Sequence, residues 1–191
     1  MCGVVVEDKD LAKLVEIGVK DSKLLTERKR EALFEPIKNI VKAYKLIIVE
    51  PAEIDEAVNS KTTNLNNLEA IKTALIINEL KPDVAIVDCP SNNIPAYTEY
   101  LQHLLTIKTE LILEHNAEKH LRVAAASILA KVTRDRIIED LKKKYGNCGS
   151  GYPSDPKTQD FLKKNAKKYP ELFRKSWATY KNLAQKSLEE Y

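Results

Sequence analysis

Short apolar runs rich in β-branched residues alternate along the chain with longer segments of helical periodicity. The runs that predict strands are 3–6, 45–50, 84–88 and 110–115. The segments that predict helices are 9–17, 26–42, 64–80, 94–105 and 119–145. This alternation is typical of an α/β protein in which helices flank a central sheet. We predict an α/β domain over 1–145, followed by a Gly/Pro loop and a basic helical extension over 146–191.

Positive charge is concentrated at the C-terminal end of the chain. Residues 141–191 hold twelve Lys/Arg and five Asp/Glu and so carry +7, whereas the whole chain carries +3. A basic end of this kind indicates contact with a polyanion. The alternative is a lysine-coated helix that faces only solvent, as many thermophilic proteins display. Charge alone favours neither interpretation.

Several classes of protein are excluded by composition. The chain has no long apolar run that would span a membrane and no signal-peptide pattern at its start, so we predict a cytoplasmic protein without a membrane contact. Its three cysteines lie far apart and show no C-x-x-C spacing. Neither a disulfide framework nor a zinc site is therefore indicated.

Two aspartates are candidates for chemistry. Asp88 closes the apolar run VAIVD, and ligands gather at the carboxyl ends of strands in α/β sheets, although such an aspartate can also cap a helix or shape a turn. Asp135 shares a helical stripe with Ala124 and Ile128 in AAASILAKVTRDR. Burying a carboxylate is costly unless a cation compensates it. That cation is either Lys131, one turn earlier, or a divalent metal ion of the kind that acts on phosphodiesters.

The loop GSGYPSDP is the most distinctive segment. Glycines on both sides of Ser150 permit positive φ, so backbone N–H groups there can approach a phosphate. Tyr152 offers a flat face to a sugar or base, or else packs as a plug in the loop.

The segment GVKDSK places Lys20 and Lys23 around Ser22. Lysines beside a hydroxyl are suited to phosphate contact. A solvated turn explains the same residues equally well.

Four motifs together carry a family resemblance. GVKDSKLLT, IVDCPSN, AAASILAKVTRD and GSGYPSDPKT, in this order, resemble type 2 ribonuclease H, the ribonuclease HII family, in its archaeal form. The resemblance implies a ribonuclease H-like fold: a mixed central sheet flanked by helices, with a helical C-terminal extension. It also implies an endoribonuclease that cleaves the RNA strand of RNA–DNA hybrids, including single ribonucleotides in duplex DNA, and leaves 5′-phosphate products. The implied cofactor is a two-metal site with Mg²⁺ or Mn²⁺.

The resemblance also assigns roles to residues. Asp88 and Asp135 match metal-binding aspartates of the family, and Tyr152 matches the tyrosine that stacks on the deoxyribose following the ribonucleotide. The residues in matching motifs that we expect to contact phosphates are Ser150, Lys20, Ser22 and Lys23. The expected partner is an RNA–DNA hybrid or ribonucleotide-containing duplex, bound by a monomer. The C-terminal AQKSLEEY is only faintly similar to a sliding-clamp-binding motif, so we assign no clamp partner.

The sequence departs from the family at its start. Family members begin with a strand bearing DEAGRGP, which supplies two further metal carboxylates, whereas residues 1–6 match the family's second strand. We therefore expect the first strand to be missing, metal binding to be weak and this chain to be impaired.

Three other interpretations follow from the same residues. One is a non-catalytic relative that only binds nucleic acid, and another is a normal enzyme whose start codon was assigned too late. The third, a small-molecule α/β enzyme, would need a Gly-rich phosphate-binding turn after an early strand, and the sequence has none.

Overall fold

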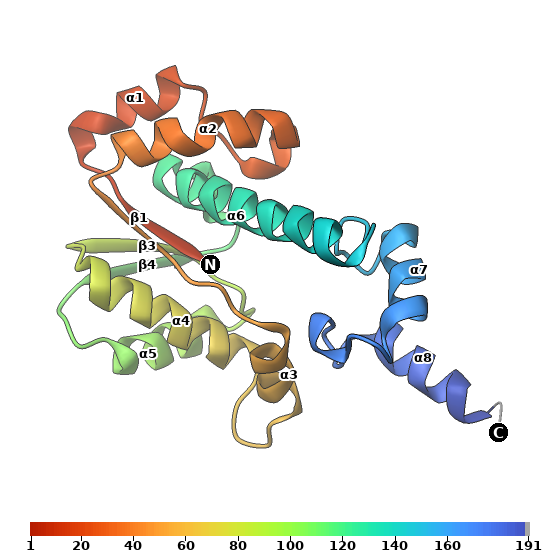
Figure 1. Ribbon diagram of the computed structural model, residues 1–191. Helices are drawn as coiled ribbons and strands as arrows, with labels where there is room; N and C mark the ends of the chain where they lie inside the picture. The colour runs from red at the N-terminus through yellow and green to blue at the C-terminus, as the bar shows by residue number, and fades with distance from the viewer. Residues whose placement is uncertain (190–191) are drawn as a thin grey trace. The chain divides into compact units, whose positions relative to one another are not determined.

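The computed structural model describes residues 1–189, with side chains described up to Leu183 (Figure 1). The chain forms two compact units. The first comprises Met1–Ile48 and Asn66–Thr133, and the second comprises Val49–Leu65 and Arg134–Tyr191. The units divide inside a long helix, whereas the sequence predicts a domain boundary after Tyr145.

The first unit contains four strands in two pairs. They are β1 (Cys2–Val5), β2 (Ala43–Leu46), β3 (Val84–Asp88) and β4 (Glu110–Glu114). β1 and β2 are antiparallel, with Cys2 opposite Leu46, and β3 and β4 are parallel, with Asp88 opposite Glu114. The pairing directions are mixed, as the family resemblance implies, but the described residues form two separate two-stranded sheets.

Helices lie on both sides of these strands. They are α1 (Leu11–Glu16), α2 (Glu27–Ile40), α4 (Leu65–Leu80), α5 (Ile94–Leu104) and α6 (Leu121–Tyr145). Figure 1 shows α1, α2 and the start of α6 on one side of the strands and α4 and α5 on the other. Single 3-10 turns complete the unit: η1 (Asp8–Asp10), η2 (Ser22–Leu24) and η3 (Ala117–Lys119). The predicted helices over these regions are thus confirmed, with ends shifted by up to two residues.

Two hydrophobic clusters form the core of the first unit. One joins α1, α2 and the start of α6 through Leu14, Ile37 and Ile128, which are fully buried. The other joins α4 and α5 to β3 and β4. Ala124 and Ala125 lie in the first cluster and are almost completely buried, so the small side chains that open α6 let it pack closely.

The strand predicted over 45–50 is wrong in its bounds. β2 covers Ala43–Leu46 because its partner β1 begins at Cys2, which is opposite Leu46. The chain then enters α3 (Pro51–Asn59), a helix that the sequence analysis missed. Pro51 fits there because the first turn of a helix needs no N–H from its residues and the fixed φ of proline matches the helix.

The second unit contains α3, the C-terminal part of α6, α7 (Pro156–Asn165), η4 (Pro170–Leu172) and α8 (Ala178–Glu189). The buried carboxylate of Asp55 on α3 accepts hydrogen bonds from the backbone N–H groups of Lys175 (2.7 Å) and Ser176 (2.9 Å). Burial raises the pKa of Asp55, but the hydrogen bonds from Ser176 and Lys175 and the charge of Arg174 together outweigh it and lower the pKa. The two backbone hydrogen bonds tie α3 to the segment that leads into α8.

No helix within residues 1–189 combines the length and apolar character needed to cross a membrane.

Candidate active site

Asp88 is the last residue of β3, as predicted from the sequence, and its side chain is exposed. Its Oδ1 accepts a hydrogen bond from the backbone N–H of Ala117 at 3.1 Å. This contact forms because β4 runs parallel to β3 and the chain turns back just beyond it. Asn116 adopts a left-handed conformation (φ 57°, ψ 42°), an orientation that asparagine tolerates better than most residues, and η3 follows.

A second carboxylate lies next to this contact. Glu118 follows Ala117 directly and is buried, with 9% of its surface exposed. Its Oε1 forms an ion pair with Lys23 Nζ at 3.0 Å, and its Oε2 is the only buried carboxylate oxygen without a partner in the described part of the chain. A buried charged oxygen without a partner is costly unless a cation or donor reaches it.

The sequence analysis missed Glu118. It considered EHNAEKH only for the spacing of its two histidines. The signal that could have found it is its position: Glu118 lies just beyond β4, the parallel partner of β3. Parallel neighbours end at the same edge of a sheet, so an acid there lies near Asp88. The histidines themselves make local contacts: His115 Nδ1 lies 3.0 Å from the carbonyl oxygen of Cys89, and His120 Nε2 contacts Glu114.

Lys23 is held beside both acids. The hydrogen bond and charge of Glu118 raise the pKa of Lys23, and the charge of Asp88 adds to this shift. Ser22 is 2% exposed, and its hydroxyl lies 3.0 Å from that of Ser127 on α6. Ser22 therefore anchors the segment, while Lys20 and Lys23 are exposed and able to meet a phosphate.

The glycine loop of the second unit is shaped by its own side chains. The Ser150 N–H donates to Asp155 Oδ2 (2.6 Å), and the Gly151 N–H donates to Thr158 Oγ1 (3.0 Å). The Gly149 N–H donates to Asn147 Oδ1 (3.1 Å). The expectation that these N–H groups approach a phosphate is not supported, because each already has an acceptor. Tyr152 remains 42% exposed.

Asp135 lies in the second unit, whereas Asp88 lies in the first. Its side chain is 20% exposed, and Arg134 Nη1 lies 3.4 Å from its Oδ1. The prediction that Asp135 binds a metal thus stays a prediction.

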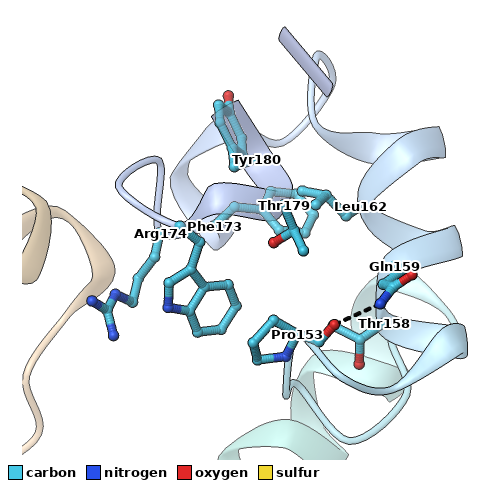
Figure 2. Close-up of a pocket in the computed structure, with 9 residues that line it drawn as sticks. Pro153, Thr158, Gln159, Leu162, Phe173, Arg174, Thr179 and Tyr180 are labelled. Atoms are coloured by element: carbon cyan, nitrogen blue, oxygen red, sulfur yellow. Dashed lines mark hydrogen bonds between the residues drawn. The ribbon is translucent and has the colours of Figure 1, made fainter. Parts of the chain in front are cut away.

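A small apolar pocket also lies in the second unit (Figure 2). Pro153, Leu162, Phe173 and Trp177 contribute its apolar walls, and Gln159 Nε2 donates to the carbonyl oxygen of Pro153 at 2.7 Å. None of the 9 lining residues is acidic, so the pocket is not a site for a hard cation.

The carboxylates of Asp88 and Glu118 in the first unit, in contrast, are of the chemical type that binds a divalent ion. Hard cations such as Mg²⁺ and Mn²⁺ prefer carboxylate oxygens, and Glu118 Oε2 lacks a partner. Within residues 1–183, whose side chains the structure describes, no three His, Cys, Asp or Glu side chains gather into a ready metal-binding group, however. Asp88 and Glu118 are thus two carboxylates, fewer than such a group requires.

The fold defines a class, the type 2 ribonucleases H. The crystal structure of ribonuclease H2 from Pyrococcus horikoshii matches with a TM-score of 0.84 at 40% identity, covering 95% of this chain and 87% of that one. The ribonuclease HII in the PCNA:RNase HII complex from Archaeoglobus fulgidus matches with a TM-score of 0.83 at 39% identity, covering 100% and 91%. A ribonuclease HIII in complex with Mn²⁺ matches with a TM-score of 0.80 at 20% identity and shares the fold.

Sequence comparison gives the family. The profile of ribonuclease HII matches residues 1–180. Ribonuclease HII of Pyrococcus furiosus is 43% identical over 188 residues, which cover 95% of this chain and 82% of the relative. The chain belongs to the ribonuclease HII family, which confirms the resemblance seen in its motifs.

Proposed function

We propose that this chain is an endoribonuclease that cleaves the RNA strand of RNA–DNA hybrids, including single ribonucleotides within duplex DNA. Membership in the ribonuclease HII family supports this reaction. The structural observation that carries the proposal is the partnerless, buried Glu118 Oε2 next to the strand-end carboxylate of Asp88.

In this proposal Asp88 and Glu118 hold Mg²⁺ or Mn²⁺. The family resemblance proposes Asp135 as a metal-binding residue as well. When bound, a pair of such ions activates water and stabilises the leaving oxygen during phosphodiester hydrolysis. The chain itself fixes the acids: the Ala117 N–H orients the Asp88 carboxylate, and Lys23 orients that of Glu118. The products carry 5′-phosphates.

Lys20, Lys23 and the exposed side chain of Ser150 contact the nucleic acid backbone in this proposal, and Tyr152 stacks on a sugar. The exposure of both lysines and of the Tyr152 ring supports these roles. Ser22 contributes by holding Lys23 in place through its contact with Ser127. We propose that the protein acts as a monomer.

The 191-residue chain alone should cleave slowly. Its sequence contains no DEAGRGP segment, and the family resemblance assigns two metal carboxylates to that segment. Fewer carboxylates bind divalent ions more weakly. Weak metal binding lowers the rate at a given metal concentration.

The test is cleavage of a DNA duplex that contains one ribonucleotide and a 5′ label. The proposal predicts slow, Mn²⁺-dependent cleavage on the 5′ side of the ribonucleotide, lost with Asp88→Asn and faster when a DEAGRGP-bearing strand is added to the chain. If the chain binds the duplex but does not cleave it, even after the DEAGRGP-bearing strand is added, the result would instead support a non-catalytic protein that only binds nucleic acid.

A further inference from the structure

Arg134 makes three contacts around the loop that carries Tyr152. Its guanidinium carbon lies 3.9 Å from the centroid of the Tyr152 ring. Its Nη2 donates to the carbonyl oxygen of Ser150 at 2.9 Å. Its Nη1 lies 3.4 Å from Asp135 Oδ1. A planar guanidinium that stacks on an aromatic face and hydrogen-bonds sideways is held in one orientation.

The backbone of the loop leaves room for this stack. Gly151 has φ +73°, and a Cβ there would lie 3.0 Å from Arg134 Nη2 and 2.7 Å from Ile138 Cδ1. A residue with a side chain at this position would therefore strain the backbone and displace the ends of the Arg134 and Ile138 side chains. Glycine allows the guanidinium to reach both the Ser150 carbonyl and the tyrosine ring.

The stack makes the two faces of the ring unequal. One face of the Tyr152 ring is covered by the guanidinium, while the residue as a whole remains 42% exposed. An incoming planar or apolar group therefore finds a single open face. Without the guanidinium the ring would gain other rotamers, and binding would have to restrict them at an entropic cost.

We propose that Arg134 is a positioning residue that fixes the Tyr152 ring with one face open to a sugar or base of the nucleic acid. The inference rests on the proposed function, because it takes Tyr152 as a nucleic-acid contact. Beyond that function, it states that the affinity for nucleic acid gained through Tyr152 depends on Arg134, which need not touch the nucleic acid itself.

The position of the ring is testable without nucleic acid. The side-chain protons of Arg134 should show upfield NMR shifts from the Tyr152 ring current, and Tyr152→Ala should abolish them. Unshifted Arg134 resonances in the wild-type chain would overturn the inference while leaving the proposed nuclease function untouched.

The effect on binding is tested by a double-mutant cycle on a ribonucleotide-containing duplex, measured by fluorescence anisotropy without divalent ions. Arg134→Met should weaken binding about three- to tenfold, the size expected for a stacked cation and one hydrogen bond. In the Tyr152→Ala background the same change should add less than about twofold, since coupled residues are not additive. Arg134→Lys should fall between wild type and Arg134→Met, because lysine keeps the charge but not the planar fork.

Arg28→Met is the matched control. Arg28 is an exposed arginine on α2, so its substitution removes the same charge from an element to which we assign no role in binding, and it should leave binding within about twofold. In cleavage assays Arg134→Met should raise KM by a larger factor than it lowers kcat. Additive effects of Arg134→Met and Tyr152→Ala would overturn the positioning role. If Tyr152→Ala alone leaves duplex affinity unchanged, the proposed role of Tyr152 fails and the inference falls with it.

Discussion

Lys23 Nζ lies 3.0 Å from Glu118 Oε1 and joins two segments that are distant in the sequence. The contact places a fixed positive charge at a buried carboxylate whose second oxygen has no partner. A lysine so placed has two opposing effects, because it holds the acid in position and also repels a second cation. In the proposed function this lysine also contacts a phosphate of the nucleic acid.

Lys23→Gln should therefore separate metal binding from nucleic acid binding. We expect Mn²⁺ affinity to rise about threefold, because the glutamine keeps an N–H donor that can hold Glu118 in position while a repelling but largely exposed charge is removed. Duplex affinity should fall, because a phosphate contact is lost. Mn²⁺ affinity is measured from the EPR signal of the free ion. Lys9→Gln is the control, because Lys9 pairs with Glu7 on another part of the unit, and equal effects of both substitutions would contradict the assignment.

Gly149→Ala should destabilise the loop more than Gly146→Ala. Both glycines have positive φ (+68° and +93°), so both changes should cost about 1–2 kcal/mol through backbone strain. A Cβ at Gly149 would also lie 2.6 Å from Thr158 N, whereas one at Gly146 would meet nothing within 4 Å. We expect the clash to add about 1–3 kcal/mol to the loss of unfolding free energy in urea. Equal losses for the two variants would show that the loop is not packed as described.

Asp155 should make the loop sensitive to acid. The backbone hydrogen bond from Ser150, above all, lowers the pKa of Asp155 from 3.8 to about 2. A lowered pKa means that the carboxylate stabilises the folded loop fully above about pH 4 and loses this effect as the pH falls through about 2. Amide hydrogen exchange at Ser150 should be slower in the wild type than in Asp155→Ala at neutral pH, and the difference in protection should shrink below pH 4. A constant difference down to pH 2 would contradict this role.

Asp135→Asn tests the metal ligand that the sequence predicts. If Asp135 holds a metal, the change should lower Mn²⁺ affinity as Asp88→Asn does. A variant with normal Mn²⁺ affinity and weakened duplex binding would assign Asp135 to the support of Arg134, which lies 3.4 Å away. Titration of both variants with Mn²⁺ and with duplex distinguishes these outcomes.

The sequence predicted correctly those elements whose residue pattern lies within a single short segment of the chain. Asp88 was found because an apolar run ending in an acid is visible within a few residues, and β3 ends there. The helix α3 was missed because the apolar run before it continues past Leu46, where pairing with β1 ends. The end of that pairing is set by residues more than forty positions away.

The candidate site depended more on such distant contacts. Glu118 becomes buried because Asn116 turns the chain and Lys23 approaches from another segment. Neither the turn at Asn116 nor the approach of Lys23 can be predicted from the periodicity of apolar residues. The sequence predicts that the loop N–H groups can bind a phosphate. In the structure, Asp155 and Thr158, several residues later, accept the hydrogen bonds of Ser150 and Gly151.

Mn²⁺ affinity of Glu118→Gln tests the central claim most directly, since it requires no cleavage by a chain expected to be slow. Loss of a direct ligand should lower the affinity by about 100-fold or more, given that groups which only orient ligands already change it 10- to 100-fold. Glu110→Gln, at the exposed opposite end of β4, is the control and should bind Mn²⁺ like the wild type. Wild-type Mn²⁺ affinity in Glu118→Gln would contradict the proposal that Asp88 and Glu118 form the metal site.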